Sequence, residues 1–248
     1  MSTPWPKHRC KPRASRAPAR WAGAALLMSL GLGQLSAQAA RPMITDDARI
    51  VDAKSCQLES WVRRNPQGDE RWALPGCNPS GHLEITAGGA RLADGQADSL
   101  GLLQGKTLFQ TLEDSRLAWG LALGVTRTPA LGATEAYGYL PATWAAVPDR
   151  VFVHLNLGAR RDSVRHSVQP TWGLGLETVL TPRMGVIAEA FGQERGRSQY
   201  QGGLRIWLVP DRVQIDTTVG NRTGQAPGQG AERWFSVGVR LLSPAFLP

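Results

Sequence analysis

The stretch VPDRVFVHLNLGAR, residues 147–160, decides the fold, because its opening phrase returns in VPDRVQIDTTVGNR, residues 209–222. After each Pro-Asp pair the apolar residues alternate with polar or small ones, as Val153, His154 and Leu155 do. A period of two sends alternate side chains to opposite faces of a β-strand. Pro-Asp between two such runs favours a tight turn. Each phrase therefore predicts a β-hairpin.

The same pattern fills the rest of the chain, with Thr181-Pro182-Arg183 as another tight turn. It predicts about twelve strands of about ten residues each, within the usual strand length. Tight turns, including one at Asp114-Ser115, alternate with longer polar loops, including one at residues 65–69. That alternation sorts short and long connections to opposite ends, as in outer-membrane barrels. We therefore predict an all-β, antiparallel up-and-down transmembrane β-barrel. A soluble barrel with a polar outer face is the alternative.

The two faces of the predicted strands differ in chemistry. If the ionisable side chains point inward, the outward sets are mostly apolar, as with Leu204, Ile206 and Leu208. An Arg or Lys facing lipid near the midplane costs roughly 2–4 kcal/mol, so the sorting is informative. The predicted lumen-facing residues are Glu59, Glu84, Lys106, His154, Glu177, Glu189, Arg205, Asp216 and Arg240.

These inward charges have both signs, and two interpretations stay open. They could line a polar lumen that selects solutes. They could instead form a salt-bridged interior that fills the barrel, since charges out of water need partners. In either case Glu177, Glu189, Arg205 and Asp216 are expected to form one electrostatic cluster, because they lie on four consecutive strands.

Residues 1–39 have the parts of a cleaved export signal. Six basic and no acidic residues precede an apolar run at residues 21–35, and an Ala-x-Ala site ends at Ala39. The chain has 28 basic and 20 acidic residues, a formal net charge of +8, and the leader holds six of the basic ones. The remaining near-neutral balance gives no indication of nucleic-acid binding. An uncleaved membrane anchor is the alternative.

Four segments follow from this division. They are a signal peptide at residues 1–39, a periplasmic segment at 40–54, the β-barrel at 55–243 and a C-terminal tail at 244–248. The second segment is polar and is expected to lie outside the sheet or to plug one end. The expected location is the cell outer membrane, with its lipid as partner.

Two cysteines, Cys56 and Cys77, remain after Cys10 leaves with the leader. A pair of cysteines in an oxidising compartment favours a disulfide. If the first two strands form a hairpin, Cys56 lies opposite Cys77, and Trp61 lies opposite Trp72. Two unpaired thiols are the alternative.

Catalytic motifs are weak in this sequence. His82, His154 and His166 remain after the leader, and none of them lies in a recognisable nucleophile motif. Asp46-Asp47 falls short of the six to eight oxygen ligands that calcium takes. No phosphate loop, zinc spacing or haem motif occurs. We therefore expect no enzyme, metal or cofactor, and an acyl-chain hydrolase built on a barrel is the least favoured alternative.

The phrase Arg41-Pro42-Met43-Ile44-Thr45-Asp46-Asp47-Ala48, followed by Cys56-Gln57-Leu58-Glu59, resembles the opening of a known family of outer-membrane barrels. That family is named for the MetA pathway of phenol degradation. Residues 105–109 and the VPDR hairpins also resemble its strands, so the resemblance covers most of residues 41–243. It implies an outer-membrane barrel that passes small organic molecules, with small hydrophobic or aromatic solutes as candidate partners. We expect a porin-like passive channel or accessory transport protein, with a non-conducting structural barrel as the alternative.

Overall fold

The computed structural model describes residues 43–66, 68–93, 99–162, 167–194, 197–224 and 232–248, all within one compact unit, Gln34–Pro248. Its strands are β1 (Ser55–Asn65), β2 (Gly68–Asn78), β3 (Leu83–Leu92), β4 (Ser99–Gln110), β5 (Leu117–Thr128), β6 (Ala133–Val147), β7 (Val151–Asp162), β8 (Ser167–Thr181), β9 (Met184–Gln193), β10 (Gln199–Val209), β11 (Val213–Arg222) and β12 (Trp234–Leu242). A short 3-10 helix, η1 (Pro129–Leu131), precedes β6. Among these residues no helix is long and apolar enough to cross a membrane.

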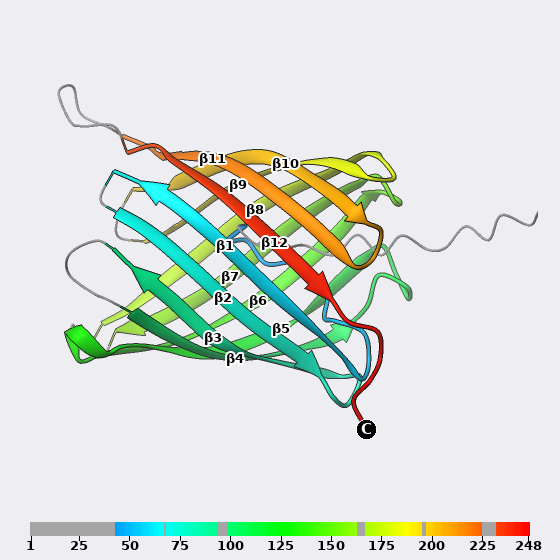
Figure 1. Cartoon of the computed structure of the whole chain (residues 1–248), viewed down its shortest axis with the longest axis horizontal. Helices are drawn as coiled ribbons and strands as arrows, with labels where there is room; N and C mark the ends of the chain where they lie inside the picture. The colour runs from blue at the N-terminus through cyan, green and yellow to red at the C-terminus, as the bar shows by residue number, and fades with distance from the viewer. Residues whose placement is uncertain (1–42, 67, 94–98, 163–166, 195–196, 225–231) are drawn as a thin grey trace, which may run out of the picture. The chain divides into compact units, whose positions relative to one another are not determined.

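The twelve strands form a closed antiparallel barrel in which each strand pairs with its sequence neighbours. β12 pairs with β1, where Glu59 lies opposite Arg240, and this pairing closes the sheet (Figure 1). Closure leaves no unpaired sheet edge. The prediction of a twelve-stranded up-and-down barrel is confirmed.

The repeated VPDR phrase forms the same turn twice. In the first copy the Arg150 N–H donates to the Val147 carbonyl over 3.1 Å, and Asp149 has a φ of 58°. In the second copy Asp211 has a φ of 56°, and the equivalent N–H···O distance is again 3.1 Å. Asp tolerates this left-handed region better than most residues with a side chain. Both predicted hairpins are confirmed.

The two ends of the barrel differ in their connections, though less regularly than predicted. The even-numbered strands end at the turn end, which carries the connections 79–82, 111–116, 148–150, 182–183 and 210–212, and the odd-numbered strands end at the loop end (Figure 1). The expected tight turn at Asp114-Ser115 is wrong, because β4 ends at Gln110 after a register shift and six residues follow before β5. The longer loop expected at 65–69 is also wrong, because Asn65 pairs directly with Gly68.

The C-terminal tail is fastened to the start of β1 at the turn end. The N–H groups of Phe246 and Leu247 donate to the Lys54 carbonyl over 2.9 and 3.0 Å. The Ser243 N–H donates to the Cys56 carbonyl over 2.9 Å. The first and last parts of the described chain are therefore held together at one end of the barrel.

The outer surface of the barrel is apolar and its interior is polar. On β10, Leu204 and Leu208 are exposed, whereas Arg205 beside them is buried. The same alternation on β11 exposes Val219 and buries Asp216 and Thr218. A water-soluble protein sorts its side chains the other way. The alternative of a barrel with a polar outer face is contradicted by this arrangement.

The predicted first hairpin also has the predicted register. Cys56 lies opposite Cys77, and the two form a disulfide, which confirms that prediction. Trp61 lies opposite Trp72, and their rings stack with centroids 5.1 Å apart. The disulfide joins β1 and β2 near the turn end of the barrel.

Reduction of this disulfide is expected to lower the free energy of unfolding by roughly 3 kcal/mol, because it releases a loop of moderate length. The two cysteines are 21 residues apart in sequence. Urea unfolding of the exported protein, with and without reductant, measures the difference. Thiol labelling of the unfolded, unreduced protein is the control. Labelling of both Cys56 and Cys77 there would contradict the bond.

Candidate functional site

Residues 43–51 lie inside the barrel and are called the plug from here on. Met43, Thr45 and Val51 are only 1–2% exposed, and Figure 1 shows this blue segment enclosed by the strands. Of the two expectations for residues 40–54, a position outside the sheet and a plug at one end, the second is closer to the position of the plug. The plug can be polar although it is buried, because the inner wall of the barrel supplies hydrogen-bond partners for its polar groups.

Carboxylates of the wall bind the backbone of the plug. The Glu189 side chain accepts hydrogen bonds from the N–H groups of Ile44 and Thr45, over 2.8 and 2.6 Å. The Glu84 carboxylate accepts one from the Val51 N–H over 2.7 Å. Buried N–H groups need partners, and ionised acceptors bind them strongly. Two of the predicted lumen residues thus hold an extended segment that has no strand partner.

Hydroxyl and amide groups of the wall also bind the plug backbone. The Thr143 hydroxyl accepts a hydrogen bond from the Ala48 N–H over 2.8 Å. The Asn78 amide donates to the Val51 carbonyl over 2.7 Å. The plug is therefore fixed from β2, β3, β6 and β9, on several sides of the lumen.

Asp46 is the central charged residue of the plug. Each of its carboxylate oxygens lies 3.1 Å from Lys106 Nζ, and the Tyr139 hydroxyl donates to the same carboxylate over 2.7 Å. Lys106 is buried, so this ion pair lies in the interior and binds the plug to β4. The acidic pair Asp46-Asp47 thus acts as a counter-ion for the barrel wall. In the described residues no group of three His, Cys, Asp or Glu side chains is placed to hold a metal.

A second charge cluster lies behind the plug. Arg205 Nη1 is 2.9 Å from Glu177, and its Nη2 is 2.9 Å from Asp216. Arg49 of the plug lies 3.7 Å from Glu177, and its guanidinium lies over the Phe152 ring at 4.5 Å. All of these wall residues are buried. Arg205 therefore connects β8 and β11 through ion pairs with Glu177 and Asp216. Glu177 is the carboxylate that also lies near Arg49 of the plug.

Glu189 does not belong to that cluster, which corrects the expectation of one group of four. Across β9 and β10, Glu189 lies opposite Gln201, whereas Arg205 lies opposite Gly185. Its carboxylate is used by the plug N–H groups and by the Gln201 amide. The register along the strands separates residues that share the inner face.

Two glycines of β8 make room for the plug. A Cβ atom at Gly173 would lie 2.6 Å from the Thr45 hydroxyl oxygen, and one at Gly175 would lie 3.0 Å from the Met43 Cε. A side chain at either position would displace the plug or be displaced by it. Glycine here lets the Thr45 and Met43 side chains of the plug approach the β8 backbone closely.

The structure places all nine predicted lumen-facing residues in buried positions of the barrel interior. The remaining pair, Glu59 and Arg240, lies where the barrel closes, with Arg240 Nε 3.8 Å from Glu59. Gln57 connects this pair to Glu84, which binds the plug. The Gln57 amide oxygen accepts a hydrogen bond from Arg240 over 2.7 Å, and its amide nitrogen donates one to Glu84 over 3.0 Å. Most of these side chains therefore support the plug, either directly or through one neighbour.

His154 lies in an arrangement that resembles a hydrolase triad in its order of groups. Its Nδ1 is 3.0 Å from the Thr143 hydroxyl, and its Nε2 is 3.5 Å from Glu177. The hydroxyl is fully buried and already accepts the Ala48 N–H, so no substrate carbonyl can approach it. His82 is exposed, and His166 lies outside the described residues. The arrangement positions the plug and gives no support to the hydrolase alternative.

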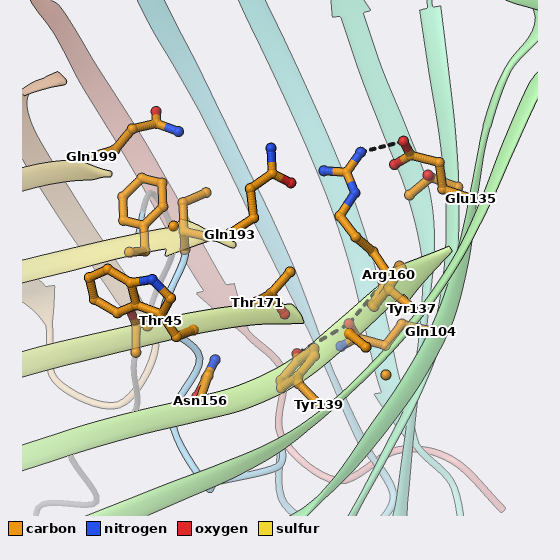
Figure 2. A pocket seen from close by; sticks show the side chains of 18 of the residues that line it. Thr45, Gln104, Glu135, Tyr137, Tyr139, Asn156, Arg160, Thr171, Gln193 and Gln199 are labelled. Atoms are coloured by element: carbon orange, nitrogen blue, oxygen red, sulfur yellow. Dashed lines mark hydrogen bonds and ion pairs between the residues drawn. The ribbon is translucent and has the colours of Figure 1, made fainter. Parts of the chain in front are cut away.

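Two cavities lie on either side of the plug. The one toward the loop end has a volume of about 530 Å³ and has Ile44 and Thr45 in its lining, and Figure 2 shows it from close by. The one toward the turn end has a volume of about 620 Å³ and is lined in part by Arg49 and Phe152. Beside Asp46 the remaining space is only about 10 Å³, on the order of one water molecule. The plug thus separates two chambers of one lumen.

Tyr137 and Tyr139, both on β6, are site residues that were not among the sequence-predicted ones. The Tyr137 hydroxyl donates to the Gln104 Oε1 atom over 3.0 Å, and the Tyr139 hydroxyl can donate to the same atom over 3.2 Å in place of its bond to Asp46 (Figure 2). Both have the parity of Thr143, which faces inward. Strand alternation alone could therefore have placed them in the lumen.

The fold and the interior define a closed barrel of the outer-membrane type with an internal plug. Residues 26–242 match the model of the family described as "Uncharacterised conserved protein UCP029691", and the chain belongs to that family. The match gives no evidence for the family named for the MetA pathway. A comparison with curated proteins finds no match.

Several solved structures have the same fold. The KdgM porin aligns with a TM-score of 0.61 and 10% identity, covering 75% of this chain and 98% of that one. The NanC porin aligns with a TM-score of 0.57 and 8% identity, covering 75% and 98%. The COG4313 outer membrane channel from Pseudomonas putida F1 aligns with a TM-score of 0.52 and 10% identity, covering 82% and 99%. At such low identity these similarities establish the architecture alone.

Proposed function

We propose that the protein is an outer-membrane channel for small organic solutes, and that the plug closes its lumen in the state described here. The observation that carries this proposal is the pair of chambers separated by the plug. The plug is bound by side chains and not by strand pairing, and the barrel closes without it. Movement of the plug would therefore join the two chambers without breaking any strand ladder.

The proposed location is supported by the apolar outer surface, since a charge facing lipid is costly. The loop end would face the exterior, and the turn end, with residues 52–54 and the tail at 244–248, would face the periplasm. Residues 1–39 would be removed on export as a signal peptide. The lumen-facing residues would then act mainly by holding the plug and the charge cluster behind it.

The proposed solutes are small molecules with an apolar or aromatic part. The resemblance to the family named for the MetA pathway supports this class, and the tyrosine and phenylalanine rings in the loop-end chamber fit it. The KdgM porin has been solved in complex with disordered oligogalacturonate. An acidic sugar is thus a solute to compare with an aromatic one in any transport assay.

Locking the plug is the test of this proposal. An ideal Cβ at Gly173 would lie 3.3 Å from the Thr45 Cβ, close to the separation of roughly 3.5–4.5 Å that a disulfide needs. The Thr45→Cys, Gly173→Cys protein should pass solutes only after reduction. Release of a small neutral sugar and of benzenesulfonate from liposomes measures the difference, which we expect to be on the order of tenfold.

The single Thr45→Cys variant, oxidised and reduced in the same way, controls for the native disulfide and for the reductant. Equal release from the locked and unlocked double variant would show that the plug is not a gate. No release from either form would favour the second candidate, a non-conducting structural barrel. The buried ion pairs of Arg205 are the observation in favour of that candidate.

A further inference from the structure

The loop-end chamber has a basic group at its mouth and rings along its wall. Arg160 of β7 forms an ion pair with Glu135 of β6, and the two side chains are 39% and 28% exposed. Arg160 lies directly opposite Tyr137 in the strand register. Figure 2 shows the Arg160 guanidinium turned toward Glu135, with Tyr137 beside the base of the Arg160 side chain. A cation and an aromatic surface therefore occur side by side on the inner wall.

The tyrosines present their rings to the chamber, because their hydroxyls are engaged elsewhere. Tyr137 and Tyr139 are nearly parallel, with centroids 6.3 Å apart and an interplanar angle of 11°. Their hydroxyls are bound by Gln104 and Asp46. Phe191 and Leu102 also line this chamber. A flat apolar ring that enters the chamber can thus pack against aromatic and aliphatic side chains of the wall.

The charged residues that line the chamber are mainly basic. They are Arg160, Arg197, Arg222 and Glu135. Arg197 forms an ion pair with Glu232 and donates to the Gly224 carbonyl. One nitrogen of Arg160 is used by Glu135, and a guanidinium carries five N–H donors. Arg160 can therefore hold Glu135 and a ligand carboxylate at the same time.

We propose that this chamber is a binding site for small aromatic carboxylates, with Arg160 holding the carboxylate and Tyr137 the ring. The proposal rests on the proposed channel function and names the solute class that enters from the loop end. The chamber volume of about 530 Å³ is within the usual range for small-molecule sites. A neutral ring would lack the guanidinium contact, and an acid without a ring would lack the aromatic one.

Binding to the refolded protein in detergent micelles tests the site separately from transport. Calorimetry with benzoate, benzamide and acetate should give saturable benzoate binding with a Kd of about 1 mM or tighter. Benzamide and acetate should each bind about tenfold more weakly, the scale of one charge-assisted contact. Arg160→Gln should weaken benzoate binding by about the same factor and leave benzamide unchanged, whereas Tyr137→Leu should weaken both.

Arg64→Gln is the matched control, because Arg64 forms an ion pair with Asp69 and its side chain is 77% exposed. It removes the same charge and should leave benzoate binding unchanged. Equal binding of benzoate and benzamide would overturn the proposal, as would an equal effect of the two arginine variants or binding to empty micelles alone. None of these outcomes rejects the proposed channel function, provided that the locked plug still controls the release of the neutral sugar. Benzoate binding without solute release would reject the channel and keep the site.

Discussion

Deletion of residues 43–51 is expected to raise the single-channel conductance of the barrel by an order of magnitude or more, as expected when a blocked pore opens. The deletion removes the lining that the plug supplies to both chambers and empties the narrow region beside Asp46. Lys106, Glu84 and Glu189 lose their plug partners but gain water in the open lumen. Planar-bilayer recording of the deleted and complete proteins measures the change.

The gel mobility of unboiled against boiled samples shows whether the deleted barrel is folded. If it does not fold, Gly173→Val provides a second route. A Cβ at Gly173 would lie 2.6 Å from the Thr45 hydroxyl, so the larger side chain should expel the plug from the lumen. A folded barrel of either kind with unchanged conductance would be evidence against a plug that blocks the pore.

Substitution of Arg205 is the other change with a large expected effect. Arg205→Ala should destabilise the folded barrel by roughly 3–5 kcal/mol, because two buried carboxylates lose their cation. Glu177 and Asp216 are each 2.9 Å from its guanidinium and are at most 2% exposed. Urea unfolding of the refolded proteins measures the loss.

Arg64→Ala is the matched control for Arg205→Ala, since exposed ion pairs contribute roughly 0–1 kcal/mol. The Arg64 side chain is 77% exposed. A loss for Arg205→Ala as small as that of the control would mean that Glu177 and Asp216 are hydrated in solution. The interior would then be a wet pore with or without the plug, and ion selectivity should change in place of stability.

Strand alternation indicates which side chains share a face of the sheet. The parity of Arg205 and Asp216 placed them in the lumen, and the adjacent strands β10 and β11 bring them into direct register. The same parity could not tell that Glu189 belongs with Gln201, because that depends on the register in which β9 pairs with β10. The alternation therefore predicts which face of the sheet a side chain lies on, but it does not predict the position of that side chain along the barrel axis.

The polar composition of residues 40–54 left a plug open as an expectation, but the contacts of the plug inside the lumen could not be predicted. Its segment has no period of two, and its partners are remote in sequence, as with Thr45 and Glu189 at a separation of 144 residues. The chemistry was visible, since Asp46 and the inward Lys106 were both noted. Asp46 can pair with Lys106 only when the plug lies inside the lumen. The lumen itself exists only once the whole barrel has closed.

The attachment at Lys54 limits how far an expelled plug could travel. The Lys54 N–H donates to the Asn78 carbonyl, and its own carbonyl accepts from the C-terminal tail, so the chain is anchored where it leaves the lumen. With residues 1–39 removed on export as proposed, the free arm is residues 40–53, which can span at most about 3.5 Å each, so the arm stays near the mouth of the barrel. Re-entry is then intramolecular, at an effective concentration on the order of millimolar. Reclosure should therefore follow each opening at a rate that does not depend on protein concentration.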